Sequence, residues 1–417
     1  MKILLLTDIP PCENFTAGLV LEKLVRFLPP EDIVLCSVVN PAIVPVIPAD
    51  LHRIPTLSLQ KPREAAVRLL PGWMGSVVSY FFELFQSVRS RCLLLPRIVD
   101  FARKNQVEAV WVVLQGQTMV RLARPLSRKL GIPLFTQVWD PFGWWLRDNA
   151  IDMATQSRLL AEFDQVILHS QSCATASWAM SINYDARYKV RNIPVIASMA
   201  SEHLSESATA PHANEDFIIA MAGQFYAQAE WLSLISALDH AHWTIAGRRI
   251  RLRVMGARFE MATHSAVNFE YLGWQSQAET IRLLAESDLL YLPYWFSEEF
   301  REEASNSFPS KLITYFAAGR PVLCHAPQYA SPATYIVEHD AGYLCDSLAV
   351  PLVLKALEYA IADKTAYAKY ARNGTACFLR DFTLERMEET FLDFLSIDKC
   401  ELPMNAACKN NEIGVLP

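Results

Sequence analysis

The chain of 417 residues lacks several patterns that define whole classes of protein. Its nine cysteines, from Cys12 to Cys408, include no C-x-x-C pair, so reduced thiols are favoured over a disulfide framework or a zinc site. No run of about 18 apolar residues is present, so no membrane-spanning helix is predicted. There is no H-E-x-x-H pair and no low-complexity tract, and we predict no metal site.

An excess of basic residues is also missing. The formal charge is -6 and the pI is about 5.9, a balance that excludes a general nucleic-acid binder. Hydrophobic residues make up 52% of the chain and charged residues 20%. This composition is typical of a globular protein with large cores, and the length suits two or three domains.

One region departs from the acidic balance. From Lys61 to Lys104 there are eight basic and three acidic residues, a local net charge of +5. Between them runs the aromatic and aliphatic segment 73–85. Two interpretations stay open: a helix that lies on a membrane surface, or an ordinary helix whose apolar face packs on its own domain.

Strand-like and helix-like segments alternate along both halves of the chain. A polar segment, 201–215, separates the halves and reads as a linker. Alternation of this kind predicts parallel sheets covered by helices, and two doubly wound domains place ligands at the carboxyl ends of their strands. The predicted strands are 3–7, 33–39, 109–114, 132–140 and 165–170, then 217–222, 251–256, 267–272, 288–293 and 321–324.

The segment 306–323 carries the most chemical information. Pro309 suits the first turn of a helix, and Ser310 can satisfy its free N–H groups. A helix start of this kind attracts anions, and Lys311 adds a full charge. Gly319 then ends the helix before the next strand. From the residues alone, a phosphate site and a capped helix with a solvated lysine remain equal alternatives.

This segment, with its P-S-K-L start and A-A-G-R-P-V-L end, resembles the donor-binding motif of group 1 glycosyltransferases (glycosyltransferase family 4). Three other segments resemble pieces of that family in the same order. They are 163–170 (F-D-Q-V-I-L-H-S), 222–226 (A-G-Q-F-Y), and 269–274 (F-E-Y-L-G-W) followed by 283–294.

The resemblance implies the GT-B fold, an α/β architecture of two Rossmann-like domains that face each other across a cleft. Residues 1–200 would form the acceptor-side domain and 216–380 the donor domain. A helix over 381–397 would cross back to the first domain, and 398–417 would form a flexible tail. The co-substrate would be a UDP- or GDP-sugar, with retention of configuration and no tightly bound metal. The implied donor-binding residues are Gly18, Gly223, Gln224, Asn306, Phe308, Pro309, Ser310, Lys311 and Thr314.

The chain also departs from the family pattern. Asn306 and Thr314 stand where many members carry two glutamates, and Gln224 and Ala229 stand where a basic pair is usual. Candidate replacements are Arg248, Arg249 and Arg258 for the basic pair and Glu298 for the first glutamate. The alternative interpretation is that these four are ordinary surface residues.

Asp140 is the candidate catalytic residue of the first domain. It ends a predicted strand, where an acid can orient or deprotonate an acceptor hydroxyl, and Trp139, Trp144 and Trp145 nearby can stack on a sugar. The alternative is an aspartate before a proline turn, with core tryptophans.

The sequence therefore predicts a cytoplasmic glycosyltransferase of glycan or polysaccharide biosynthesis. Its acceptor would be a glycan or a lipid-linked sugar, with the membrane surface as a further candidate partner through Lys61–Lys104. A catalytically silent GT-B scaffold is the main alternative, and a sugar-nucleotide epimerase is a third. Fold analogy alone does not separate them.

Overall fold

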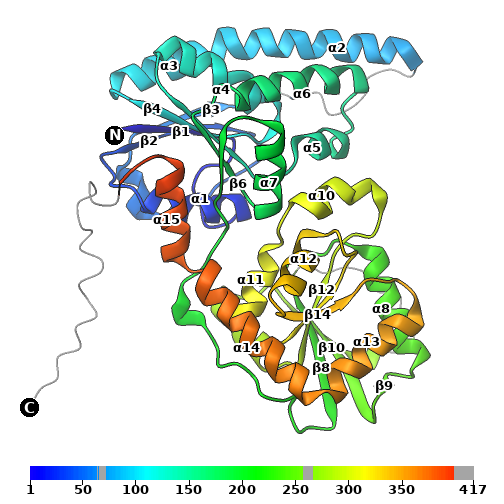
Figure 1. The fold of residues 1–417 in the computed structure, drawn as a ribbon. Helices are drawn as coiled ribbons and strands as arrows, with labels where there is room; N and C mark the ends of the chain where they lie inside the picture. Colours follow the sequence, from blue (N-terminus) through cyan, green and yellow to red (C-terminus); the bar gives the residue numbers. More distant parts are fainter. Residues whose placement is uncertain (63, 65–71, 257–265, 399–417) are drawn as a thin grey trace, which may run out of the picture. The chain divides into compact units, whose positions relative to one another are not determined.

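The computed structural model describes residues 1–62, 64, 72–256 and 266–398. The chain divides into two compact units (Figure 1). The first comprises Met1–Ala174, Asp185–Ile193 and the chain from Glu388 onward, and the second comprises Thr175–Tyr184 and Pro194–Met387. Among the described residues, no helix combines the length and the apolar composition that crossing a bilayer requires.

The first unit contains a seven-stranded sheet in the order β3-β2-β1-β4-β5-β6-β7. Ile3 of the central strand pairs with Ile33 on one side and Ala109 on the other, both in parallel. The central strands are buried throughout, as expected for parallel strands covered on both faces. The strands are β1 (Ile3–Thr7), β2 (Ile33–Val39), β3 (Thr56–Gln60), β4 (Ala109–Val113), β5 (Leu134–Val138), β6 (Ser172–Thr175) and β7 (Arg191–Pro194).

Helices flank this sheet, and the chain's last helix is among them (Figure 1). Phe391 of α15 packs against Trp111 with ring centroids 4.8 Å apart, and Phe394 packs on Phe135. Ser172 donates a hydrogen bond to the Phe394 carbonyl at 2.6 Å. The C-terminal helix thus belongs to the core of the first unit. The helices are α1 (Thr16–Arg26), α2 (Gly72–Arg89), α3 (Leu95–Lys104), α4 (Gly116–Leu130), α5 (Phe142–Asp148), α6 (Met153–Ile167) and, from Glu388 on, α15 (Leu384–Phe394), with short turns η1 (Ala49–Arg53) and η2 (Ser90–Leu94). Most of α7 (Trp178–Arg187) belongs to the second unit.

The second unit has a parallel sheet in the order β11-β10-β8-β12-β13-β14, with β9 antiparallel to β10. The strands are β8 (Asp216–Ala222), β9 (Thr244–Ile245), β10 (Arg248–Met255), β11 (Phe269–Gly273), β12 (Leu289–Pro293), β13 (Val322–His325) and β14 (Gly342–Cys345). The helices are α8 (Gln228–His240), α9 (Gln277–Ala285), α10 (Arg301–Asn306), α11 (Ser310–Ala317), α12 (Ser331–Glu338), α13 (Val350–Ala362) and α14 (Lys364–Asp381), with turns η3 (Ser201–His203), η4 (Ala266–Asn268) and η5 (Glu298–Phe300).

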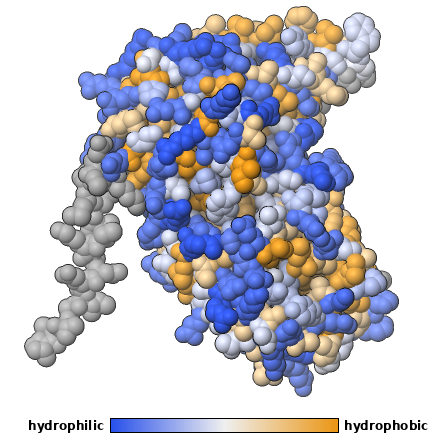
Figure 2. Space-filling model, in the orientation of Figure 1, coloured by the Kyte–Doolittle hydropathy of each residue, from blue (hydrophilic) through white to orange (hydrophobic). Residues whose placement is uncertain are grey.

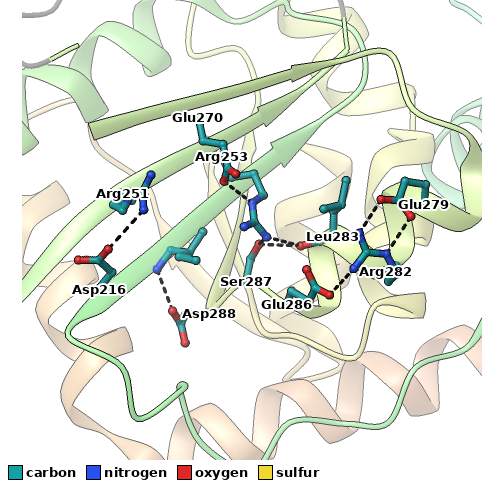
Figure 3. Close-up of polar contacts among 11 residues, drawn as sticks. Asp216, Arg251, Arg253, Glu270, Glu279, Arg282, Leu283, Glu286, Ser287 and Asp288 are labelled. Carbon is teal, nitrogen blue, oxygen red and sulfur yellow. Dashed lines mark hydrogen bonds and ion pairs between the residues drawn. The ribbon is translucent and has the colours of Figure 1, made fainter. Parts of the chain in front are cut away.

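Partly buried polar contacts join the strands of the second unit to one another and to its helices (Figure 3). Arg253 of β10 forms an ion pair with Glu270 of β11 at 2.7 Å and donates to the Leu283 carbonyl of α9 at 3.1 Å. Asp288 accepts hydrogen bonds from the backbone N–H groups of His212 and Ile218. These contacts fix the start of β8 and the order β8-β10-β11.

Two predicted elements are wrong in detail. The segment 165–170, predicted as a strand, contains the end of α6, and the strand is β6 further on. Leu159, Phe163 and Val166 recur at helical spacing on the buried face, and the Asp152 side chain caps the helix, so helical periodicity overrides the short β-branched run. The helical pattern predicted over 380–395 is broken between α14 and α15.

Candidate functional site

A cavity of about 160 Å³ lies in the second unit, where β8, β10 and β11 end. This is the carboxyl edge of the sheet, the edge at which doubly wound sheets bind ligands. The start of α11 and Thr280 of α9 form the rest of its wall. The lining residues are Ala222, Gly223, Met255, Gly256, Trp274, Gln275, Thr280, Ser310, Lys311, Thr314 and Tyr315.

Two glycines let the backbone close in around this cavity. Gly223 follows β8 with φ +94°, and Gly256 follows β10 with φ +123°. A Cβ on Gly256 would lie 2.3 Å from the Gly223 carbonyl oxygen, which is a clash. A Cβ on Gly223 would lie 3.2 Å from Cε of Lys311. Only glycine permits both the backbone conformation and this approach, so the wall presents peptide groups rather than side chains.

Lys311 is the cation of the cavity. Its position in the first turn of α11, after Pro309 at the N-cap, places it at the positive end of the helix dipole. Its ammonium group donates to the Gln224 carbonyl and lies 4.0 Å from the ring centroid of Tyr226. Burial lowers the pKa of Lys311 to about 7. Among the described residues, no carboxylate forms an ion pair with this ammonium group. A desolvated ammonium group of this kind favours the entry of an anion, because the anion would replace the lost hydration.

Tyr315 ties the helix to the sheet. Its hydroxyl accepts a hydrogen bond from the Ala222 backbone N–H at 2.9 Å, and burial raises the pKa of this phenol above its ordinary value. Because Ala222 precedes Gly223, the contact holds the start of α11 beside the end of β8. Ser310, Lys311, Thr314 and Gly223, all predicted donor-site residues, therefore lie around one cavity.

The sequence prediction did not single out Trp274, Gln275 or Thr280, which complete the cavity. Trp274 is 74% exposed at its mouth, and Gln275 donates to the Leu272 carbonyl at 2.6 Å. The sequence did contain a feature that could have identified Trp274 and Gln275: Gly273 ends the preceding strand, and residues after such a strand lie at the edge of the sheet that binds ligands.

Asn306 and Phe308 lie apart from this cavity. The Asn306 side chain donates to the Glu302 carbonyl at 2.7 Å and accepts from Asn183. Phe308 packs edge-to-face on Trp178 with ring centroids 5.5 Å apart and borders a second cavity of about 430 Å³. Both residues hold α7 and α10 together within the second unit.

The candidate replacements for the basic pair are also elsewhere. Arg248 donates to the Asp216 carbonyl and Arg249 forms an ion pair with the Asp216 carboxylate, at the amino end of β8. Figure 3 shows Arg251 of the same strand directed to Asp216 as well. This end of β10 is about 20 Å from the cavity. Arg258 lies outside the described residues.

Glu298 lies in η5, exposed, and forms an ion pair with Arg301 at 2.8 Å. Gln224 is exposed and contributes its carbonyl oxygen, not its side chain, to the contact with Lys311.

The first unit contains the remaining predicted residues. Asp140 follows β5, and burial raises the pKa of its carboxyl group. Within the described part of the chain, that carboxylate makes no hydrogen bond or ion pair. Gly18 lies in the first turn of α1, where a Cβ would meet the Cys12 sulfur at 2.2 Å. Packing against the loop after β1 is enough to require glycine here, and the donor-binding role of Gly18 stays a prediction.

No family model matches the sequence, and no curated protein matches it. Solved structures do match the fold. The Anabaena protein HepE, in a structure described as a complex with UDP, has a TM-score of 0.63 and 15% identity, covering 95% of this chain and 100% of that one. Sucrose-phosphate synthase from Thermosynechococcus elongatus has a TM-score of 0.64 and 11% identity, covering 95% and 98%. Trehalose 6-phosphate synthase from Burkholderia multivorans has a TM-score of 0.62 and 13% identity, with the same two shares.

These likenesses extend over nearly the whole chain and include both units. Together with the two parallel sheets, they show that the fold is GT-B, as the sequence predicted. HepE is described in further structures with UDP-glucose as well as with UDP.

Proposed function

We propose that this protein is a glycosyltransferase that transfers a sugar from a nucleotide-sugar donor. The observation that carries the proposal is the glycine-walled cavity at the carboxyl edge of the second sheet, with the ammonium group of Lys311 at the start of α11. A helix N-terminus, exposed peptide groups and one cation suit a diphosphate. The names of the structural neighbours, which include UDP complexes, support the same reading.

In this proposal the donor's diphosphate lies against Ser310, Lys311 and the peptide groups after Gly223. As the bond from the sugar to the diphosphate breaks, negative charge grows on the leaving phosphate oxygen. Lys311 in its protonated form and the helix dipole stabilise that charge in place, without reorganisation. The exposed indole of Trp274 supplies a stacking face for the nucleobase at the cavity mouth. We favour a UDP-sugar over a GDP-sugar because UDP occurs in the named neighbours.

Asp140 is the group of the first unit that we assign to the acceptor. Its carboxylate makes no hydrogen bond or ion pair in the described part of the chain, and its raised pKa suits a group that accepts a proton from a hydroxyl. We propose a glycan or a lipid-linked sugar as the acceptor and the cytoplasm as the site of action. Transfer would retain the anomeric configuration and need no tightly bound metal.

One observation favours the silent GT-B scaffold as a second candidate. Asn306 stands at a position where many members of the family that the chain resembles carry a glutamate. It is engaged by Asn183 and Glu302 and does not line the cavity. A scaffold of this kind would keep the fold and lose donor binding.

The test is a thermal-shift and calorimetry panel of UDP, GDP, ADP and their sugar conjugates. The protein is compared with Lys311→Met and with the control Lys369→Met. Lys369 is an exposed lysine of α14 that forms an ion pair with Asp340. Stabilisation by one nucleotide, lost in Lys311→Met and kept in Lys369→Met, supports the donor site. Release of nucleoside diphosphate from that sugar conjugate then tests transfer. If no nucleotide binds, the transferase proposal is wrong and the scaffold is favoured.

A further inference from the structure

Helix α2 exposes its large apolar side chains. Trp73 is 75% exposed, Phe81 62% and Phe85 61%. Their neighbours on the outward side are also apolar and exposed, and the spacing of three and four residues keeps them on one side of the helix. Figure 2 shows hydrophobic side chains along the margin of the molecule where α2 lies in Figure 1. The exposed apolar face consists of Trp73, Met74, Val77, Val78, Phe81, Leu84, Phe85 and Val88.

The buried side of the same helix is small and polar. Gly75, Ser79, Glu83, Gln86 and Ser87 face the first unit. Glu83 forms an ion pair with Arg121 of α4, and both side chains are fully buried. This is the reverse of an ordinary surface helix, which buries its apolar side and exposes its polar side. The apolar face of α2 therefore does not pack on the described residues of its own unit.

Basic residues follow this face along the chain. Residues 89–104, which run from the end of α2 through η2 and α3, expose five cations and one acid, Asp100. Arg89 and Arg97 also line, with Lys61, a cavity of about 700 Å³. Arg91 forms an ion pair with Glu162. The exposed cations are Arg89, Arg91, Arg97, Arg103 and Lys104.

We propose that the apolar face of α2 inserts into the headgroup region of an anionic lipid bilayer, with the cations of η2 and α3 bound to lipid phosphates. The helix would lie in the plane of the surface, because its opposite side is fixed to α4 through Glu83 and Arg121. At about 27 Å it is long enough to place both ends in contact with lipid.

Charge complementarity selects an anionic bilayer as the occupant of this face. A chain of net charge -6 is repelled by anionic lipid as a whole, so binding would use the cations of residues 89–104 that follow the apolar face. Trp73, at the first turn of α2, is the residue type that favours the membrane–water boundary.

The inference rests on the proposed function only for the role of lipid binding, which would bring the acceptor-side unit to a lipid-linked sugar. Lipid binding itself requires no transfer. Vesicle binding by Lys311→Met and nucleotide binding by an α2 variant therefore report on the two proposals separately.

The experiment is vesicle flotation of the full chain. The vesicles contain either phosphatidylcholine alone or an equal mixture with phosphatidylglycerol. The test variant is Phe81→Ser with Phe85→Ser. The matched control is Leu352→Ser with Leu379→Ser, two similarly exposed apolar side chains of α13 and α14. A third variant, Arg89→Glu with Arg97→Glu, tests charge.

We expect binding to the phosphatidylglycerol vesicles, weakened at least about tenfold by the phenylalanine pair and by the arginine pair. The leucine control should bind as the parent does. Far-ultraviolet circular dichroism and nucleotide binding should be the same in all variants, since every changed side chain is exposed. Added salt should weaken binding by the parent.

The inference would be overturned if the parent bound neither kind of vesicle. Equal binding by the parent and the phenylalanine variant would also overturn it. Sedimentation velocity provides the remaining check. A dimer that dissociates in the phenylalanine variant, without vesicle binding by the parent, would assign the face to a second copy of the chain instead.

Discussion

The low pKa of Lys311 makes donor binding depend on pH. Burial holds this pKa at about 7 in the free protein, against an ordinary value of 10.5. A diphosphate beside the ammonium group raises the pKa again, so binding takes up a proton wherever the free lysine is neutral. The protonated fraction of the free protein is about 0.9 at pH 6 and about 0.03 at pH 8.5. We therefore expect affinity for UDP-glucose to fall about 30-fold over this range, or about 2 kcal/mol.

Calorimetry of UDP-glucose binding from pH 6 to pH 8.5 tests this expectation. Buffers of different ionisation enthalpy give the number of protons taken up, which should rise from near zero to near one. UDP-glucose is preferred to UDP because a terminal phosphate itself titrates near pH 6. Lys311→Arg stays charged and should bind without this pH dependence, and Lys311→Met should bind weakly at every pH. Firm binding by the parent with no proton uptake would show that the ammonium group does not meet the phosphate, and would refute the reasoning.

Three further predictions concern the glycine wall, the buried ion pair of α2 and the acceptor side. Gly256→Ala should lower the free energy of unfolding by at least about 2 kcal/mol in urea titrations, because its Cβ meets the Gly223 carbonyl at 2.3 Å. Glu83→Gln leaves the charge of Arg121 buried with Gln117 but without its carboxylate partner and should cost about 3 kcal/mol, whereas Glu83→Leu with Arg121→Met should recover most of that loss. Asp140→Asn should slow sugar transfer at least about a hundredfold while the Kd for the donor stays the same.

Each of these has an outcome that contradicts it. Wild-type stability of Gly256→Ala would mean that the backbone around the cavity relaxes freely. A double variant as unstable as Glu83→Gln would show that packing, not the buried charge, sets the cost. Unchanged transfer by Asp140→Asn would remove this residue from the acceptor site.

Much of the fold could be predicted because parallel strands that are buried on both faces produce a clear pattern in the sequence. Runs such as 3–7 and 217–222 are apolar, short and closed by a polar residue or a glycine. The edge strand β3 and the short strands β6 and β14 were not predicted. Their formation depends on pairing with neighbouring strands more than on the β-propensity of their own residues. The residues near Lys311 could be found because a helix cap and a following glycine are local features.

The rest was decided by tertiary structure. The sequence by itself determined two Rossmann-like domains and an anion-ready helix start. Only the folded chain separates Arg248 and Arg249 from the cavity, because a strand carries its two ends about 20 Å apart. Only the folded chain shows which side of α2 faces outward: the stripes of the helix are local, but the burial of Glu83 depends on Arg121, which is 38 residues away along the chain. The periodicity of the sequence shows that a helix has two different faces. The element on which the helix packs determines which of those faces is exposed to solvent.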